Sequence, residues 1–209
     1  ILQNFLRRIC GCRGDWTSGD LAEELIAGVS AQLGSTGEMV LGLSGGVDSS
    51  YCLHLLAEME LKPKLAFSMD NSWNNPLADE NEMKMVEALK VPFLKETIDL
   101  EKFKKLQQAF IKAGVINIEI PTDHLLMTIS YEMAVKYKVK YIISGGNHSE
   151  EGVMPESWSK NANDLTHIKA IYKQFTGKNL KGLPLCSLWR YNYYKWIKKI
   201  QIINLLDYY

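Results

Sequence analysis

The sequence lacks a charge surplus of either sign. Its 209 residues carry 24 lysines and arginines against 24 aspartates and glutamates. A dedicated nucleic-acid-binding domain normally has a basic surplus, so the balance argues against that class, although it allows a local basic face. The sequence also lacks an apolar run near the roughly 20 residues that span a bilayer, and no signal peptide is visible. We therefore expect a cytoplasmic protein that binds neither nucleic acid nor a membrane.

Cysteine is scarce, and its four positions show no disulfide-scaffold pattern. A reducing compartment is therefore expected. The pair Cys10 and Cys12 is too closely spaced for a standard Cys-x-x-Cys zinc knuckle, although it would be half of one if the native protein began earlier. Cys52 falls on the apolar face of a predicted helix, and Cys186 falls in an aromatic run.

The most informative segment, residues 39–50, has the sequence MVLGLSGGVDSS. Its apolar start has the composition of a buried strand, and an amphipathic helical pattern resumes at Asp48. Between them, the pair Gly45-Gly46 lets the backbone turn tightly and leaves its N–H groups pointing outward. These donors suit a phosphate or pyrophosphate, as do the positive helix end and three hydroxyls. The hydroxyls belong to Ser44, Ser49 and Ser50.

Asp48 in the first helical turn would repel phosphates unless a cation lay between them, which predicts a magnesium ligand. The loop is neither a Walker A motif nor Gly-x-Gly-x-x-Gly. It resembles, residue for residue, the Ser-Gly-Gly-x-Asp-Ser signature of the PP-loop ATP pyrophosphatases. Those enzymes split ATP between its α and β phosphates and place AMP on a carbonyl oxygen of the substrate. The resemblance implies ATP and Mg²⁺ as cofactors; the alternative is a Gly/Ser-rich turn without a ligand.

Beyond this loop, predicted strands alternate with predicted helices. The pattern predicts an α/β fold with a parallel twisted sheet and helices on both faces, a Rossmann-like three-layer sandwich. The PP-loop resemblance implies the adenine nucleotide α-hydrolase type of this fold. Further strands are expected at 64–70, 91–98 and 139–144, and helices at 15–35, 77–90, 100–113 and 121–138.

Ligands of such sheets bind beyond the carboxyl ends of the strands, where two more polar clusters fall, at 69–75 and 144–151. In the first cluster, the resemblance places Met69 and Asp70 around adenine and ribose. Asp70 would accept a hydrogen bond from a ribose hydroxyl or, alternatively, cap the following turn. His124, early in its helix, would contact a phosphate or the substrate or, alternatively, bond to local backbone.

The second cluster, SGGNHSEE, would let a nucleotide approach the backbone at Gly145 and Gly146. Glu150 would complete the magnesium site with Asp48. The cluster resembles the Gly-Thr-x-Asn-Lys-Ser-Glu segment of ammonia-dependent NAD synthetases. Gly145 stands at the threonine position, and His148 at the lysine position replaces a fixed charge with a titratable one. A loop that ends in solvated glutamates is the alternative.

Segments 144–158, 183–191 and 200–208 are similar to the N-acetyl sugar amidotransferases of surface-polysaccharide biosynthesis, a resemblance that runs from about residue 15 onward. It implies that the acetamido carbonyl of a nucleotide-linked N-acetyl sugar is adenylated and that ammonia then displaces AMP. Asp48 and Glu150 would be the catalytic metal ligands. Substrate contacts are expected from Asn147, His148, Glu151, His124 and Trp158.

No cysteine has a recognisable glutaminase setting, so the resemblance implies a separate glutaminase subunit that delivers ammonia. The aromatic helix predicted from Leu188 to Ile200 would supply a homodimer surface. We expect three regions. They are an N-terminal segment and helix (1–35), the remnant of a longer cysteine-containing region; a PP-loop domain (36–182); and a truncated aromatic helical segment (183–209).

Three other functions stay open. A tRNA-modifying PP-loop enzyme would want a basic surface and, for thiolation, well-placed cysteines. An NAD-synthetase-like ammonia ligase is weakened by Gly145 and His148. A non-catalytic adenine-nucleotide-binding module is weakened by the presence of both Asp48 and Glu150, since a passive AMP binder has no pyrophosphate to neutralise.

Overall fold

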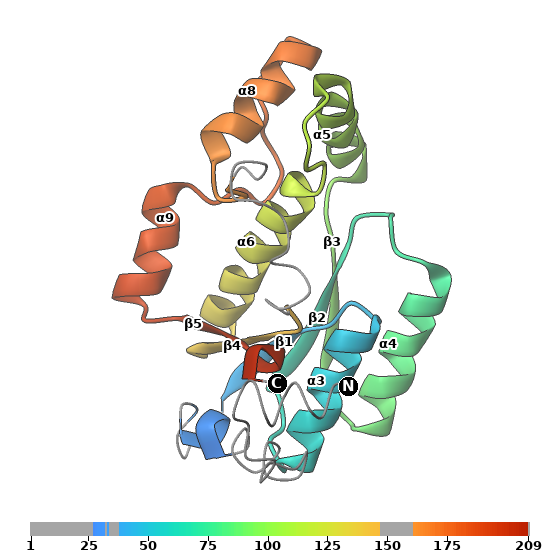
Figure 1. The fold of residues 1–209 in the computed structure, drawn as a ribbon, viewed down its shortest axis with the longest axis vertical. Coiled ribbons are helices and arrows are strands. Elements are labelled where there is room, and N and C mark those ends of the chain that lie inside the picture. The colour runs from blue at the N-terminus through green and yellow to red at the C-terminus, as the bar shows by residue number, and fades with distance from the viewer. Residues whose placement is uncertain (1–26, 32, 34–37, 147–160, 209) are drawn as a thin grey trace, which may run out of the picture.

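A single parallel sheet organises the protein (Figure 1). The computed structural model describes residues 27–31, 33, 38–146 and 161–208. All neighbouring strands pair in parallel, in the order β3-β2-β1-β4-β5. The strands are β1 (Met39–Gly42), β2 (Leu65–Asp70), β3 (Phe93–Thr97), β4 (Tyr141–Ser144) and β5 (Gln201–Asn204).

Helices connect these strands, and several begin at a side-chain cap. Asn75, Asp99 and Asp164 each accept a hydrogen bond from a backbone amide of the first turn that follows. The α-helices are α3 (Val47–Glu58), α4 (Pro76–Ala88), α5 (Leu100–Ala113), α6 (Ile120–Lys136), α8 (Leu165–Thr176) and α9 (Leu188–Asn192). The π-helix η3 (Tyr193–Ile197) follows α9, and the 3-10 helix η4 (Leu205–Tyr208) follows β5.

The sheet separates two hydrophobic cores, because alternate residues of a strand point to opposite faces. In β1, Val40 packs with α5, α6 and α8, whereas Met39 and Leu41 pack with α3 and α4. The same alternation divides Ile142 from Ile143 in β4. The predicted three-layer α/β sandwich is therefore confirmed.

The four predicted strands are present, but the region after residue 160 differs from its prediction. Helix α8 is present in the structure but was not predicted from the sequence. The helix expected from Leu188 to Ile200 ends early, as α9 and the π turn η3. Residues 201–204 of the expected C-terminal helical segment form β5, which pairs with β4. The segment after residue 182 therefore completes the same sheet.

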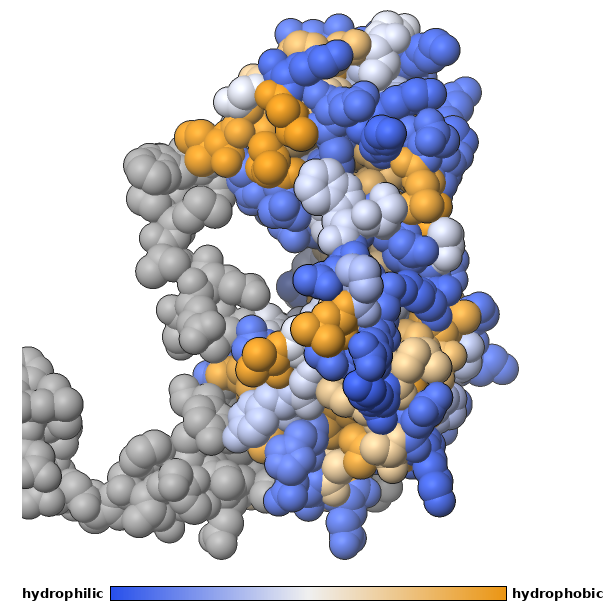
Figure 2. All heavy atoms as spheres, turned by 90° about the vertical axis from the view of Figure 1, so that its right-hand side faces the viewer, coloured by the Kyte–Doolittle hydropathy of each residue, from blue (hydrophilic) through white to orange (hydrophobic). Residues whose placement is uncertain are grey.

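The surface is mixed in polarity. Figure 2 shows the side on which α4 lies, where hydrophilic residues cover most of the surface and hydrophobic residues form separate patches. No helix within the described ranges combines the length and apolarity needed to cross a membrane.

Candidate functional site

The strand order places a topological switch point between β1 and β4. From β1 the chain moves outward through β2 to β3, and β4 and β5 then extend the sheet on the opposite side of β1. Loops that follow two adjacent parallel strands diverge at such a switch point, and ligands bind there. The loop after β1 and the start of the loop after β4 both lie at this place.

The loop after β1 depends on glycine at position 45. Gly45 has a φ of +67°, in the left-handed region that side chains disfavour. A Cβ built there would lie only 2.2 Å from the carbonyl oxygen of Ala78 in α4. The loop backbone therefore packs directly against the first turns of α4, and any side chain at this position would force the two apart.

Serine hydroxyls hold this loop in shape. The amide of Ser44 donates to Oγ of Ser49 over 3.1 Å, and the two hydroxyl oxygens lie 3.0 Å apart. The hydroxyl of Ser50 donates to the carbonyl oxygen of Gly46. Ser49 is buried, whereas Ser44 is exposed. The hydroxyls that the sequence analysis assigns to pyrophosphate thus bond within the loop.

The N-termini of α3 and α6 have no side-chain cap, whereas those of α4, α5 and α8 do. The N-cap residue of α3 is Gly46, so the first-turn amides have no side-chain acceptor at that position. An uncapped helix start that follows a glycine turn is suited to an anion. Asp48 lies in the same turn and is exposed to solvent. Its carboxylate is therefore accessible to a cation that accompanies a bound anion.

The loop after β4 contacts this helix start through backbone. A Cβ on Gly145 would lie 2.9 Å from the amide nitrogen of Ser49 and 3.0 Å from its Cα. One turn further along α3, the thiol of Cys52 donates to the carbonyl oxygen of Ser144 over 3.7 Å. Burial, and secondarily the charge of Asp48, raise the pKa of this thiol to about 12, so it stays protonated as a donor. The structure therefore brings two of the predicted clusters together.

Strand β5 adds groups to the same edge that the sequence analysis missed. A Cβ on Gly146 would lie 3.4 Å from Oδ1 of Asn204, whose amide nitrogen donates to Asp207 over 2.9 Å. The sequence contains a signal for these two residues, since Asn204 and Asp207 are the polar residues at the end of an apolar run. However, the aromatic residues that precede this run have helical spacing, so the run resembles the end of a helix.

The cluster after β2 is only partly oriented as expected. Met69 belongs to the hydrophobic core, so its side chain is directed away from a ligand and only its backbone is left for one. Asp70 is half-buried and accepts a hydrogen bond from the amide of Ser72 over 3.0 Å. The turn-capping alternative for Asp70 is therefore realised in the structure.

His124 has a structural role instead of the expected substrate contact. It is fully buried, with Nδ1 2.7 Å from the carbonyl oxygen of Ala162. Its Nε2 accepts a hydrogen bond from the amide of Cys186 over 3.1 Å. Burial, and then the charge of Lys169, lower the imidazole pKa against the raising effect of the Ala162 bond. Both ring nitrogens are thus occupied, with the proton on Nδ1.

The remaining predicted site residues lie outside the described residues. They are Asn147, His148, Glu150, Glu151 and Trp158. Within the described part of the chain, no three His, Cys, Asp or Glu side chains gather as metal ligands do. Asp48 is therefore the described carboxylate that the loop offers to a metal.

Comparison with known proteins identifies the family. The family model for NAD synthase matches residues 22–183, which include the loops that follow β1 and β4. The chain belongs to the NAD synthase family. Its membership confirms the predicted PP-loop superfamily.

Relatives of known name support the same placement. GMP synthase [glutamine-hydrolyzing] of Aliivibrio salmonicida is 46% identical over 65 residues, which are 31% of this chain and 12% of that protein. The enzyme of the same name from Photobacterium profundum is 50% identical over 56 residues, 27% of this chain and 10% of that protein. The similarity thus spans about a tenth of the length of these curated relatives.

Among solved structures, the NH3-dependent NAD synthetase from Campylobacter jejuni subsp. jejuni NCTC 11168, in complex with the nitrate ion, is similar in fold. The TM-score is 0.51 at 17% identity, over 78% of each chain. This similarity confirms the α/β architecture of the NAD synthase family member described here.

Proposed function

We propose that this NAD synthase family member is an ATP-dependent amidotransferase that forms AMP and pyrophosphate. Its substrate would be the acetamido group of a nucleotide-linked N-acetyl sugar used in surface-polysaccharide biosynthesis, with ammonia as the nitrogen donor. The observation that carries the ATP-dependent part is the uncapped start of α3, with Asp48 in its first turn, packed against Gly145.

The residues present fit ATP with Mg²⁺. The turn at Gly45-Gly46 packs against Ala78. The amides of the first turn of α3 would donate hydrogen bonds to the pyrophosphate portion. Magnesium usually binds one or two carboxylates together with phosphate oxygens, so the single described carboxylate, Asp48, would suffice on the protein side. Bound magnesium would neutralise charge as pyrophosphate leaves. Glu150 remains the proposed second ligand.

The reaction needs no protein nucleophile. The acetamido oxygen attacks the α-phosphorus of ATP, the bond from that phosphorus to the bridging oxygen breaks, and pyrophosphate leaves. Ammonia then adds to the imidate carbon and gives up one proton to solvent, and the carbon–oxygen bond to AMP breaks. AMP departs with the former carbonyl oxygen, and the product is an acetamidinium group. The protein would contribute alignment of the reactants and stabilisation of charge at the leaving pyrophosphate.

The packing at position 145 differs from that expected for the NAD synthetase segment. The NAD synthetase segment carries threonine at this position, and the backbone of Ser49 leaves no room for that side chain here. The loop after β4 therefore approaches α3 more closely than a threonine would allow. The similarity of segments 183–191 and 200–208 to the sugar amidotransferases supports the sugar substrate. A separate glutaminase subunit and a homodimer belong to this proposal.

The test measures AMP and pyrophosphate release from ATP, Mg²⁺ and ammonium chloride across a panel of UDP-linked N-acetyl sugars. We expect release that depends on one sugar, together with a product in which NH replaces an oxygen atom, detected by mass. Release that depends instead on nicotinate adenine dinucleotide would establish the NAD-synthetase-like alternative. Release that depends on tRNA would establish the tRNA-modifying alternative.

The variant Asp48→Asn separates catalysis from passive nucleotide binding. Because it removes the charge and keeps the shape, we expect turnover to fall at least about a hundredfold, a loss of roughly 2.7 kcal/mol of transition-state stabilisation. The circular dichroism spectrum and melting temperature should stay unchanged. Unchanged turnover would remove the metal role of Asp48.

A further inference from the structure

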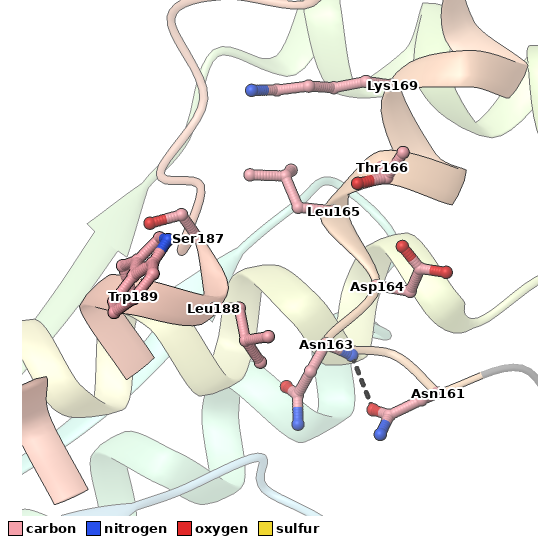
Figure 3. Close-up of a pocket in the computed structure, with 9 residues that line it drawn as sticks. All are labelled: Asn161, Asn163, Asp164, Leu165, Thr166, Lys169, Ser187, Leu188 and Trp189. Atoms are coloured by element: carbon pink, nitrogen blue, oxygen red, sulfur yellow. Dashed lines mark hydrogen bonds between the residues drawn. The ribbon is translucent and has the colours of Figure 1, made fainter. Parts of the chain in front are cut away.

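An open cavity lies between the start of α8 and the start of α9 (Figure 3). Its volume is about 570 Å³, within the range of small-molecule sites. One wall is residues 161–169 and the other is residues 187–189. In Figure 3 the side chains of Leu165 and Lys169 extend from α8 into the space between the two walls.

Both walls are bound to the same buried imidazole. His124 bonds to the carbonyl of Ala162, next to the first wall, and to the amide of Cys186, next to the second. The bond to Cys186 is buried and the bond to Ala162 is part-buried, and together they fix the separation of two segments of the chain. The cavity is therefore a built feature of the fold.

The cavity has one large aromatic surface available to a ligand. Trp189 lines it and is 86% exposed, although aromatic side chains usually bury most of their area. The amide side chains of Asn161 and Asn163 and the hydroxyl of Thr166 also line it. An exposed aromatic face beside amides and hydroxyls suits a planar base and a sugar.

The surroundings are basic, although the chain as a whole is neutral. Residues 161–190 contain five basic side chains, of which Arg190 pairs with Glu132 over 2.9 Å, against one acidic side chain, Asp164. Asp164 accepts the hydrogen bond that caps α8, and its carboxylate points away from the cavity in Figure 3. Lys169 and Thr166 also line a neighbouring cavity together with Lys173 and Lys181. The basic surface is therefore continuous with the first cavity.

We propose that this cavity binds the nucleotide diphosphate portion of the sugar substrate, an inference that rests on the proposed function. Trp189 stacks on the base, Lys169 pairs with the diphosphate, and the amides bond to ribose hydroxyls. The charge complementarity selects this occupant over an apolar peptide, which would leave Lys169 without an anionic partner. His124 is the positioning residue that holds the two walls.

The experiment measures UDP binding by calorimetry, without ATP, and the KM values for ATP and for the UDP-sugar. Trp189→Ala and Lys169→Ala should each weaken UDP binding about five- to 150-fold. This is the loss of affinity expected when one stacking interaction between a base and an aromatic side chain is removed. The KM for the UDP-sugar should rise in parallel, while the KM for ATP stays within about twofold. Trp196→Ala and Lys112→Ala are matched controls, since both residues are exposed and neither lines the cavity.

The outcomes separate the two proposals. If the wild type turns over a UDP-sugar and both variants keep its KM, the cavity assignment is wrong and the proposed function stands. If no UDP-sugar is turned over, yet UDP binds and Trp189→Ala abolishes binding, the cavity binds a nucleotide and the proposed function is wrong. Binding of tRNA that competes with UDP and is lost in the same variants would overturn the assignment in favour of a nucleic acid.

Discussion

Gly145 lies in backbone contact with Ser49, the residue whose hydroxyl closes the loop after β1. A Cβ at position 145 would lie 2.9 Å from the Ser49 amide nitrogen and 3.3 Å from the carbonyl carbon of Asp48. Two loops from adjacent strands thus meet with no side chain between them. The position of α3 relative to β4 consequently depends on the absence of a side chain at one residue.

The first prediction concerns this contact. Gly145→Thr should displace the loop from α3 and lower ATP-dependent turnover at least about tenfold. A misalignment that raises the activation free energy by about 1.4 kcal/mol has that effect. Overpacking should also cost about 1–3 kcal/mol of stability. Pyrophosphate release and urea denaturation measure the two effects. Gly28→Ala is the control, since a Cβ there meets nothing within 4 Å; full activity in Gly145→Thr would contradict the packing argument.

The second prediction follows from the lowered pKa of His124. The native state holds this imidazole neutral, so its contribution to stability is complete above the ordinary pKa of 6.5 and is lost as the pH falls below that value. The stability advantage of the wild type over a variant without this imidazole, measured as the difference between their urea midpoints, should therefore shrink as the pH falls below 6.5. His124→Gln should lose about 1–3 kcal/mol at pH 7, because a buried polar group is left unpaired, and should fall less steeply with pH. Parallel pH profiles for the two proteins would exclude His124 as the source.

The third prediction concerns the buried thiols. Burial raises the pKa of Cys52 to about 12 and also raises the pKa of Cys186, so neither is a thiolate at neutral pH. A maleimide reagent at pH 7.5 should leave both unlabelled in the native protein and label both in urea, as located by peptide mass spectrometry. Rapid native labelling of Cys52 would show that its contact with Ser144 opens readily.

The fourth prediction concerns Glu82, a carboxyl on α4 that is only 1% exposed. Ser68 donates to its Oε2 over 3.1 Å, while Oε1 is buried without a hydrogen-bond partner. Burial raises its pKa, so the native state favours the protonated form, and stability falls as the pH rises through the native pKa. Glu82→Gln should remove this contribution to the decline above pH 4.5, the ordinary pKa of a glutamate, whereas Glu82→Ala should cost about 1–3 kcal/mol.

A suitable control for Glu82 is Glu87→Gln on the exposed part of the same helix. It should leave the pH profile unchanged. A difference between the wild-type and Glu82→Gln midpoints that stays constant with pH would show that the Glu82 carboxyl does not contribute to the pH dependence.

Local patterns predicted the first four strands and the meeting of the loops, because parallel strands end at one edge of the sheet. They failed at β5, a four-residue strand that follows an aromatic segment with helical spacing. Helix α8 was also missed, although Asp164 and Gly177 provide its N-cap and its left-handed C-cap. Propensity over short segments cannot separate a strand from a helix when tertiary pairing decides the outcome.

The roles of individual side chains were harder to predict than their location. Whether His124 faces a ligand or the backbone depends on Ala162 and Cys186, which lie far along the chain. The contact between Gly145 and Ser49 likewise arises only when β4 pairs with β1. Sequence motifs indicate the chemistry of a site, whereas long-range packing determines which atoms remain available to a ligand.

Strand β1 is the central strand, paired with β2 on one side and with β4 on the other. A nucleotide held between the loops after β1 and β4 would connect the two halves of the sheet. In hydrogen exchange, such a ligand should slow exchange of the amides of β2 and of β5 together, although neither strand need touch it. Occupancy of the nucleotide site would then be detected as a single cooperative change in the strands on both sides of the β1–β4 pair.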